Sequence, residues 1–230
     1  MNIGIILSGG VGVRMGLSIP KQYAIVNEQP VIKYCLNEFL INPRIDAIVV
    51  VVADEWLSFV KKIVAEISSN SLVYYAQPGE TRQYSIYNAL KVVQEKGFCK
   101  DDIVVIHDAA RPLVSNFLIN QCIDECREVD GVMPVIPVKD TIYQSTDGMQ
   151  IQSLLNRNQL WAGQAPEAFK FAKYLHIHEM ISRDELLKIN GSTEIAYKYG
   201  LNCKMIKGDP INFKITTQED IYRLEVILKS

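Results

Sequence analysis

The sequence predicts an α/β fold in which helices flank a mostly parallel, twisted β-sheet. Short apolar runs rich in β-branched residues alternate with longer amphipathic stretches along the 230 residues of the chain. This alternation is typical of βαβ units, because strands buried on both faces of a parallel sheet are continuously apolar. With 48% apolar residues the chain can fill one core, and we expect a single domain over residues 1–230.

The predicted strands begin with two strongly apolar runs. Residues 3–7 open the chain, and residues 45–52 form a nearly continuous isoleucine and valine run. Such runs are expected where a strand has neighbours above and below it. Shorter runs predict further strands at residues 72–76, 103–107, 131–137 and 202–206.

Five amphipathic helices are predicted between and after these strands. Apolar residues recur at spacings of three and four, which places them on one helix face. The predicted helices cover residues 30–41, 55–68, 81–95, 115–128 and 218–228. Ser115 or Asn116 and Thr216 or Thr217 stand where N-caps are expected.

Residues 138–160 depart from this alternation of apolar strands and amphipathic helices. The segment is polar and alternating, and Asp147 and Gly148 form a turn signal within it. We therefore expect a hairpin-like arm that projects from the sheet.

Composition argues against two broad functions. A formal net charge of −2 is unlike that of a general nucleic-acid or membrane-surface binder, which needs a basic face. No apolar run approaches the roughly 18 residues of a membrane span. The five cysteines are odd in number and widely spaced, so we expect reduced core thiols in a cytoplasmic protein, with Cys122 and Cys126 packed on one helix face. His176 and His178 are expected to be exposed.

The first strand breaks into a glycine-rich turn that contains Ser8, Gly9, Gly10, Gly12 and Arg14. Glycines let backbone N–H groups approach phosphate oxygens closely. The turn is neither a dinucleotide fingerprint, because methionine stands in the place of the third glycine, nor a Walker A loop, because no Gly-Lys-Ser/Thr follows.

Two cations accompany this turn. Arg14 lies within it and Lys21 follows in the segment Pro20-Lys21-Gln22, which suits a nucleoside triphosphate. The alternative is a tight turn with two solvated cations. The position directly after the first strand favours phosphate, since α/β sheets bind ligands there.

Several short motifs occur in a fixed order along the chain and resemble those of a known protein family. Gly-Gly-x-Gly-x-Arg-Met and Pro-Lys-Gln (within 9–22) are followed by His-Asp-Ala-Ala-Arg-Pro (107–112), Asp-Thr (140–141), Asn-Arg-Asn-x-Leu-Trp (156–161) and Asn-Phe-Lys-Ile-Thr (212–216). The whole chain resembles the cytidylyltransferases of polyol phosphates, whose members use 2-C-methyl-D-erythritol 4-phosphate or ribitol 5-phosphate. The resemblance implies a Rossmann-like nucleotidyltransferase fold, CTP with a divalent metal, normally Mg²⁺, and a homodimer in which the arm at 138–160 reaches the partner's site.

The resemblance also implies roles for individual residues. Arg14 and Lys21 would hold the triphosphate and stabilise developing charge, and Lys214 would bridge CTP and the acceptor phosphate. Asp108 would bind the metal, since Mg²⁺ prefers hard oxygen ligands; a turn or N-cap aspartate is the alternative. Gly79, Arg82 and Ser85 match the segment that reads the cytosine and anchors the nucleotide. Arg111, Thr141 and Arg157 match positions that hold the acceptor, with a surface ion pair as the alternative for each arginine.

Departures from the motif pattern concern the acceptor. Members that use methylerythritol phosphate commonly carry Thr-Asp-Glu-Ala-Ser where this chain has Ser-Thr-Glu-Ile-Ala at 192–196, and an aspartate where it has Ile211. Asp209 lies two residues upstream, out of register, and its part in metal binding stays open. With Gly163 and Gln164 before Ala-Pro, these departures favour the ribitol-phosphate side, although another polyol or sugar phosphate fits equally well.

Two other functions remain open on the sequence alone. A nucleotide-sugar pyrophosphorylase that uses UTP or GTP would carry the same kind of loop. A catalytically silent nucleotide-binding protein would keep the pocket, but it has no need for convergent cations. The leading hypothesis is CTP-dependent cytidylyl transfer to a polyol phosphate, which needs charge neutralisation rather than a nucleophilic side chain.

Overall fold

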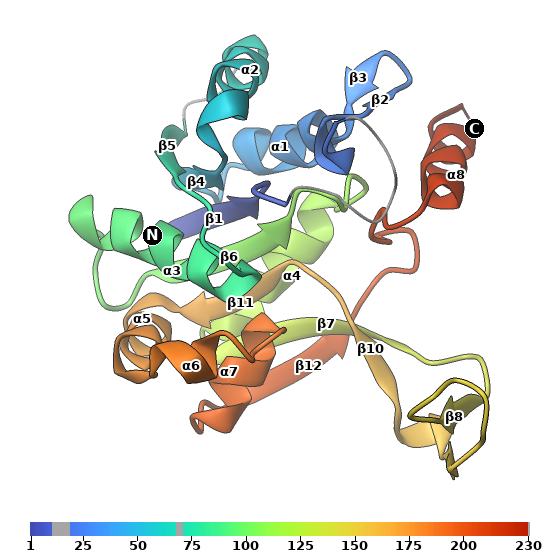
Figure 1. The fold of residues 1–230 in the computed structure, drawn as a ribbon. Coiled ribbons are helices and arrows are strands. Elements are labelled where there is room, and N and C mark those ends of the chain that lie inside the picture. The colour runs from blue at the N-terminus through green and yellow to red at the C-terminus, as the bar shows by residue number, and fades with distance from the viewer. Residues whose placement is uncertain (11–18, 68–70, 230) are drawn as a thin grey trace.

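The computed structural model describes residues 1–10, 19–67 and 71–229, in which one mixed β-sheet forms the centre (Figure 1). Within these ranges the sheet has eight strands in the order β10-β7-β11-β6-β1-β4-β5, with β12 paired to β7. No helix in the described part of the chain is long and apolar enough to cross a membrane. The strands are β1 (Asn2–Leu7), β4 (Ala47–Val51), β5 (Leu72–Ala76), β6 (Ile103–Asp108), β7 (Gly131–Pro137), β10 (Trp161–Gly163), β11 (Glu167–Lys170) and β12 (Cys203–Lys207).

The parallel strands β1, β4, β5 and β6 include the most buried part of the sheet. Strands β4 and β6 are buried along their whole length, which accounts for their continuous apolar sequences. The pairing register places Leu7 beside both Val51 and Asp108. The carboxyl ends of β1, β4 and β6 therefore meet at one edge of the sheet, where open α/β sheets bind ligands.

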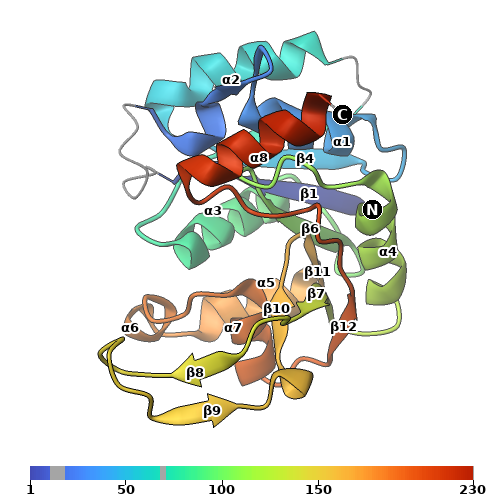
Figure 2. The ribbon, with the colours of Figure 1, turned by 90° about the vertical axis from the view of Figure 1, so that its right-hand side faces the viewer.

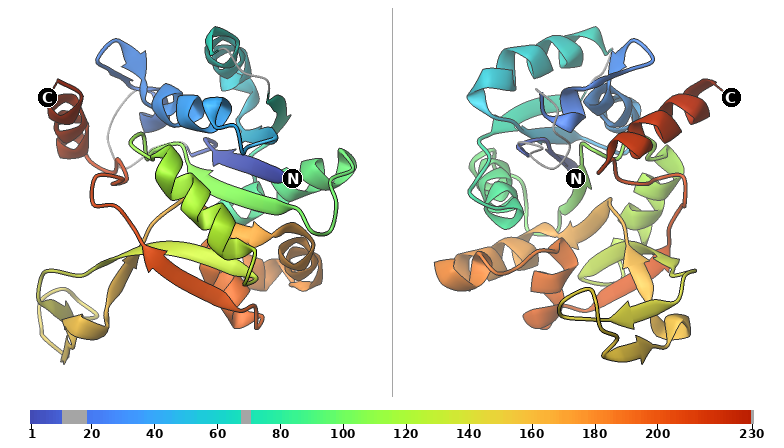
Figure 3. Two further views of the ribbon diagram at one scale, coloured as in Figure 1. Left: turned by 180° about the vertical axis from the view of Figure 1, so that it is seen from behind. Right: turned by 45° about the vertical axis from the view of Figure 1, so that its right-hand side comes forward.

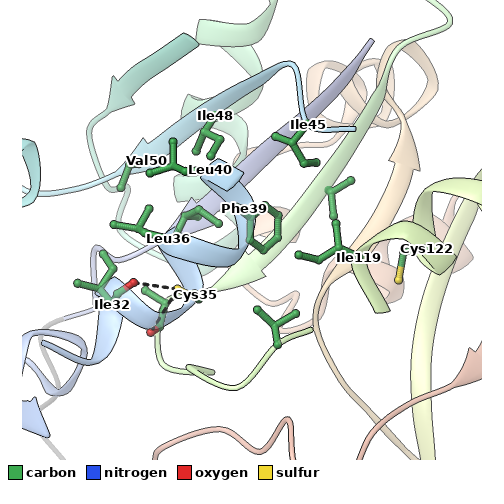
Figure 4. Packing of buried hydrophobic residues seen from close by; sticks show 14 of the residues in the cluster. Ile32, Cys35, Leu36, Phe39, Leu40, Ile45, Ile48, Val50, Ile119 and Cys122 are labelled. Atoms are coloured by element: carbon green, nitrogen blue, oxygen red, sulfur yellow. Dashed lines mark hydrogen bonds between the residues drawn. The ribbon is translucent and has the colours of Figure 1, made fainter. Parts of the chain in front are cut away.

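Helices cover both faces of this sheet (Figures 1 and 3). Helices α1, α2 and α4 share one apolar cluster with the sheet, in which Phe39, Cys122 and Cys126 are fully buried (Figure 4). Helices α3, α5 and α7 share a second cluster, and Leu224 of α8 lies in a third. The helices are α1 (Val31–Ile41), α2 (Asp54–Glu66), α3 (Arg82–Glu95), α4 (Asn116–Cys126), α5 (Phe171–Met180), α6 (Arg183–Leu186), α7 (Ser192–Lys198) and α8 (Gln218–Lys229).

The predicted arm is a hairpin. Strands β8 (Ile142–Gln144) and β9 (Ser153–Leu155) pair antiparallel and project away from the main sheet (Figure 2). Gly148 adopts a positive φ of 72°, and the Asp147 carboxylate accepts hydrogen bonds from the amides of Met149 and Gln150 at 2.8 and 2.9 Å. The turn signal at Asp147 and Gly148 is confirmed.

The predicted α/β class with its mostly parallel sheet is confirmed, and each predicted strand and helix has a counterpart within a few residues. Ser115 is the N-cap of α4, accepting from the Leu118 amide at 3.2 Å. Thr217 directly precedes α8. Its amide donates to the carboxylate of Asp220, in the first turn of the helix, at 2.9 Å. Strands β10 and β11 and helices α5, α6 and α7 were not predicted. Strand β11 has four residues and begins with a buried glutamate, so it lacks the apolar signal of a central strand.

The prediction that His178 is exposed was wrong, whereas His176 is exposed. His178 is 2% exposed and stacks on Tyr87 of α3, with ring centroids 5.9 Å apart. Its Nδ1 lies 2.9 Å from the Tyr174 carbonyl, which can only accept, so Nδ1 carries the proton and the buried Nε2 has no partner. Burial lowers the pKa of His178 to about 4, against the smaller opposing effect of the Tyr174 carbonyl.

This buried histidine predicts a loss of stability in mild acid. Between its unfolded pKa of about 6.5 and its native value of about 4, the unfolded chain binds a proton that the native state does not. The free energy of unfolding should therefore fall as pH is lowered through this window, by up to about 3 kcal/mol for one such group. His178→Phe, which keeps an aromatic ring, should make the decline shallower in urea unfolding at a series of pH values.

His176→Phe is the matched control, because the same substitution on the exposed side of α5 should leave the pH dependence unchanged. An unchanged slope in His178→Phe would contradict the assignment of a neutral, buried His178.

Candidate active site

A cavity of about 670 Å³ opens at the carboxyl ends of β1 and β6, between the glycine-rich turn and the start of α3. The topology explains its position, because strands β1, β4 and β6 end at this edge. Most of the residues predicted to bind the nucleotide line it. They are Gly9, Gly10, Lys21, Gly79, Arg82, Ser85, Asp108 and Lys214.

The described part of the glycine-rich turn is held by the segment that carries Lys21. Gln22 is 3% exposed, and its side-chain amide donates to the carbonyls of Ser8 at 2.6 Å and Gly10 at 2.8 Å. Tyr23 adds a bond from its hydroxyl to the Ser8 carbonyl at 3.2 Å and stacks on Trp56 of α2. The 3₁₀ turn of residues Lys21–Tyr23 thus fixes Lys21 and the turn relative to each other.

Close packing explains two of the glycines. A Cβ atom at Gly9 would collide with the Pro78 ring, and one at Gly79 would collide with the Tyr84 side chain and lie 3.0 Å from the Ser85 amide. The Gly79 amide donates to the Ser85 hydroxyl at 3.0 Å, and that hydroxyl donates to the Thr81 carbonyl at 3.0 Å. Ser85 therefore shapes the turn that forms this wall of the cavity.

Asp108 is the electrostatic centre of the site. Arg82 Nε lies 3.2 Å from one carboxylate oxygen, while Lys214 Nζ lies 2.9 Å and Arg111 Nε 3.8 Å from the other. Burial alone would raise the pKa of Asp108, but the charges of Arg82, Lys214 and Arg111 outweigh it and hold the pKa well below its usual range. Asp108 is therefore ionised at physiological pH, and it gathers cations from three separate stretches of the chain.

Lys214 reaches Asp108 because the segment before it is tied to the sheet. The buried amide of Gln164 accepts from the Asp209 amide at 3.0 Å and donates to the carbonyls of Asp209 at 2.9 Å and Asn212 at 3.3 Å. Asn212 donates to the Ala165 carbonyl at 2.6 Å. No sequence pattern predicts these supports, although Asn212 lies within the motif that includes Lys214.

A second, larger groove of about 1140 Å³ adjoins the cavity, and Lys214 lines both. Its lining includes Arg111, Lys139, Asp140 and Trp161. Arg111 also donates to the Asn212 carbonyl at 2.8 Å. The groove therefore runs from the cations around Asp108 toward the base of the arm.

Two predicted acceptor residues are not brought to the cavity. Thr141 and Arg157 are both exposed on the arm, and Arg157 donates to the Lys139 carbonyl at 2.9 Å.

Of the other residues predicted to bind the nucleotide, Ser8 supports the sheet. The Ser8 hydroxyl donates to the Val51 carbonyl at 2.6 Å, which fixes the end of β1. Gly12 and Arg14 lie outside the described residues.

The chain matches one family of known proteins along nearly its whole length. A family model described as IspD, 2-C-methyl-D-erythritol 4-phosphate cytidylyltransferase, matches residues 3–230. The ribitol-5-phosphate cytidylyltransferase of Vibrio parahaemolyticus is 30% identical over 229 residues, covering 99% of this chain and 96% of the relative. The 2-C-methyl-D-erythritol 4-phosphate cytidylyltransferase of Clostridium beijerinckii is 33% identical over 227 residues, covering 98% and 97%.

Solved structures also match along nearly the whole chain. The crystal structure of 4-diphosphocytidyl-2C-methyl-D-erythritol synthase from Anaerococcus prevotii superposes with a TM-score of 0.82 at 25% identity, covering 100% of this chain and 96% of that one. The 2-C-methyl-D-erythritol 4-phosphate cytidylyltransferase of Francisella tularensis gives a TM-score of 0.81 at 26% identity, covering 98% of each chain.

Proposed function

The chain belongs to the IspD family and is a nucleotidyltransferase that moves a cytidylyl group from CTP to a polyol phosphate, and from this premise we propose that the cavity around Asp108 binds the CTP triphosphate. The observation that carries the proposal is the convergence of Lys21, Arg82, Lys214 and Asp108 on one cavity at the carboxyl ends of the parallel strands. Arg14, which follows four residues after Gly10 in the sequence, would add a further cation.

The proposed mechanism is direct transfer. A phosphate oxygen of the acceptor attacks the α-phosphorus of CTP in line, the new phosphoanhydride bond forms, and the bond to pyrophosphate breaks. Both reactants are anionic, so positioning and charge neutralisation dominate. Lys21 would stabilise the triphosphate, while Lys214, which lines both the cavity and the adjoining groove, would contact both reactants.

The donor set of this cavity fits Mg²⁺ carried by the nucleotide. Among the described residues, no group of three or more histidine, cysteine, aspartate or glutamate side chains converges to hold a metal alone. One or two protein carboxylates suffice when phosphate oxygens and water complete the coordination shell. Asp108 would be that ligand, and the bound ion would neutralise charge on the phosphates.

For the acceptor, we propose ribitol 5-phosphate. The chain departs from the methylerythritol-phosphate pattern at residues 192–196 and at Ile211, which is exposed. Relatives named for ribitol 5-phosphate and for 2-C-methyl-D-erythritol 4-phosphate both match along nearly the whole chain, so the proposal rests on these departures. Arg111 would bind the acceptor from the groove beside Lys214.

The arm supports a proposed homodimer. It exposes apolar side chains, among them Tyr143 at 55%, Ile151 at 69% and Leu154 at 63%, which is costly for a hairpin in water. Thr141 and Arg157 would reach an acceptor site if the arm of one subunit enters the groove of the other. Each complete site would then combine one subunit's cavity with its partner's arm.

We place this single nucleotidyltransferase domain in the cytoplasm. All five cysteines are free, and Cys35, Cys122 and Cys126 are buried, as expected in a reducing compartment. One sheet links strands from β1 to β12, which supports one domain.

The charge roles predict the effect of removing either lysine. Lys21→Ala and Lys214→Ala should each lower turnover by at least about a hundredfold, the scale for losing a preorganised charge at a transition state. Pyrophosphate release in the presence of CTP, Mg²⁺ and acceptor measures this. Lys62→Ala, on the exposed side of α2, is the control and should keep the wild-type rate. Near-wild-type turnover in both site variants would refute the assignment.

The acceptor is tested by a substrate panel. Ribitol 5-phosphate should give faster CTP-dependent pyrophosphate release than 2-C-methyl-D-erythritol 4-phosphate and other alditol or sugar phosphates. UTP, GTP and ATP should replace CTP poorly. Preference for methylerythritol phosphate would overturn the proposed acceptor, and equal use of all nucleotides would argue against the cytosine-specific role of the Gly79 turn.

A shared site predicts complementation between two inactive variants. Arg157→Ala and Lys214→Ala homodimers should each be nearly inactive. After subunit exchange, mixed dimers contain one site with both residues intact, so activity should return to at most about a quarter of wild type. No recovery, with mixed dimers verified by mass, would show that each arm serves its own subunit.

A further inference from the structure

Arg82 is held at all three guanidinium nitrogens by three different elements. Its Nε lies 3.2 Å from Asp108 at the end of β6, its Nη1 donates to the Ser192 hydroxyl at 2.5 Å, and its Nη2 donates to Glu167 of β11 at 3.3 Å. Arg82 begins α3 and lines the nucleotide cavity. An arginine side chain has several rotatable bonds and many rotamers. Three hydrogen bonds to its guanidinium hold it in one orientation.

Glu167 is a buried carboxylate that lies outside the lining of the cavity. It is 6% exposed and contacts Arg82, which lines the cavity. Its second oxygen accepts from both the amide and the hydroxyl of Thr193, at 3.1 and 2.7 Å. Arg82 on one side and the Thr193 amide at the start of α7 on the other can only donate, and the Thr193 hydroxyl donates in this geometry.

These partners fit a carboxylate better than an amide. A carboxylate has acceptor sites on both oxygens, whereas an amide has one acceptor and one NH₂ group. Glutamine at this position removes the charge and keeps one acceptor oxygen. With its NH₂ toward Arg82, donor faces donor. With its NH₂ toward Thr193, the hydroxyl can accept, but the Thr193 amide loses its partner and Arg82 faces a neutral carbonyl oxygen in place of the charge.

We propose that Glu167 is a positioning residue for nucleotide binding, which holds Arg82 in the cavity wall and ties it to the first turn of α7. The inference rests on the proposed role of Arg82 in binding CTP. Without the Glu167 charge, Asp108 is the remaining described carboxylate in contact with Arg82. Arg82 would then be held by Asp108 at one side alone and would leave its orientation in the cavity wall.

The test measures CTP binding by calorimetry in the absence of acceptor, so that turnover does not enter. Glu167→Gln should raise the dissociation constant for CTP about tenfold, the scale of one hydrogen bond to a charged group. In steady-state assays the KM for CTP should rise with little change in kcat. Glu167→Asp keeps the charge but is one methylene shorter, and it should lose less affinity than Glu167→Gln.

Thr193→Ala separates positioning of Arg82 from support of α7. It removes the hydroxyl donor to Glu167 and leaves the Arg82 contact in place, so CTP affinity should stay near wild type even if the melting temperature falls. Loss of CTP affinity in Thr193→Ala equal to that in Glu167→Gln would overturn the proposal in favour of a structural role.

A double-mutant cycle tests whether Glu167 acts through Arg82. In an Arg82→Ala background, Glu167→Gln should change CTP affinity by less than about twofold. A full tenfold effect in that background would contradict the proposal, as would wild-type affinity in Glu167→Gln alone. If Arg82→Ala itself binds CTP normally, the proposed role of Arg82 is wrong and the inference falls with it. Weakened binding in Arg82→Ala beside normal binding in Glu167→Gln would instead refute the inference alone.

Discussion

The ionised carboxylate of Asp108 is the interaction on which the site depends. It lies at the end of a buried parallel strand, and it holds Arg82 from α3, Arg111 from the turn after β6 and Lys214 from the C-terminal segment. Cations gathered in a half-buried cavity repel one another unless an anion lies among them. Asp108 thus assembles a basic cavity in a chain whose net charge is −2, and an anionic substrate can then replace part of its contacts.

The rest of the fold keeps those cations in place. Gln22 ties Lys21 to the glycine-rich turn, Gln164 ties the Lys214 segment to the end of β10, and Glu167 ties Arg82 to β11. Each is a buried polar side chain whose partners belong to a distant part of the sequence. Rigid supports of this kind reduce the reorganisation that a charged site would otherwise undergo during the reaction.

Much of the fold could be predicted from the sequence, for a physical reason. Buried parallel strands leave continuous apolar runs, so β1, β4 and β6 were predicted along with the edge at which they end. The approach of Lys214 to Asp108, 106 positions apart in sequence, came from the resemblance, since no local pattern encodes it. Glu167 and the burial of His178 were missed, because a single polar residue in a short strand or on a helix shows no period that distinguishes a buried position from an exposed one. The placement of Thr141 and Arg157 on the arm follows from the hairpin, whereas the proposed contact of both residues with the acceptor depends on the proposed homodimer.

The most direct measurement is a crystal structure of the protein with CTP and Mg²⁺. We predict that the triphosphate lies in the cavity between the glycine-rich turn and Asp108, within hydrogen-bonding distance of Lys21 and Lys214, with the cytosine against the Gly79 turn. A triphosphate bound in the larger groove beside the arm, with Lys21 and Arg82 out of contact, would contradict it.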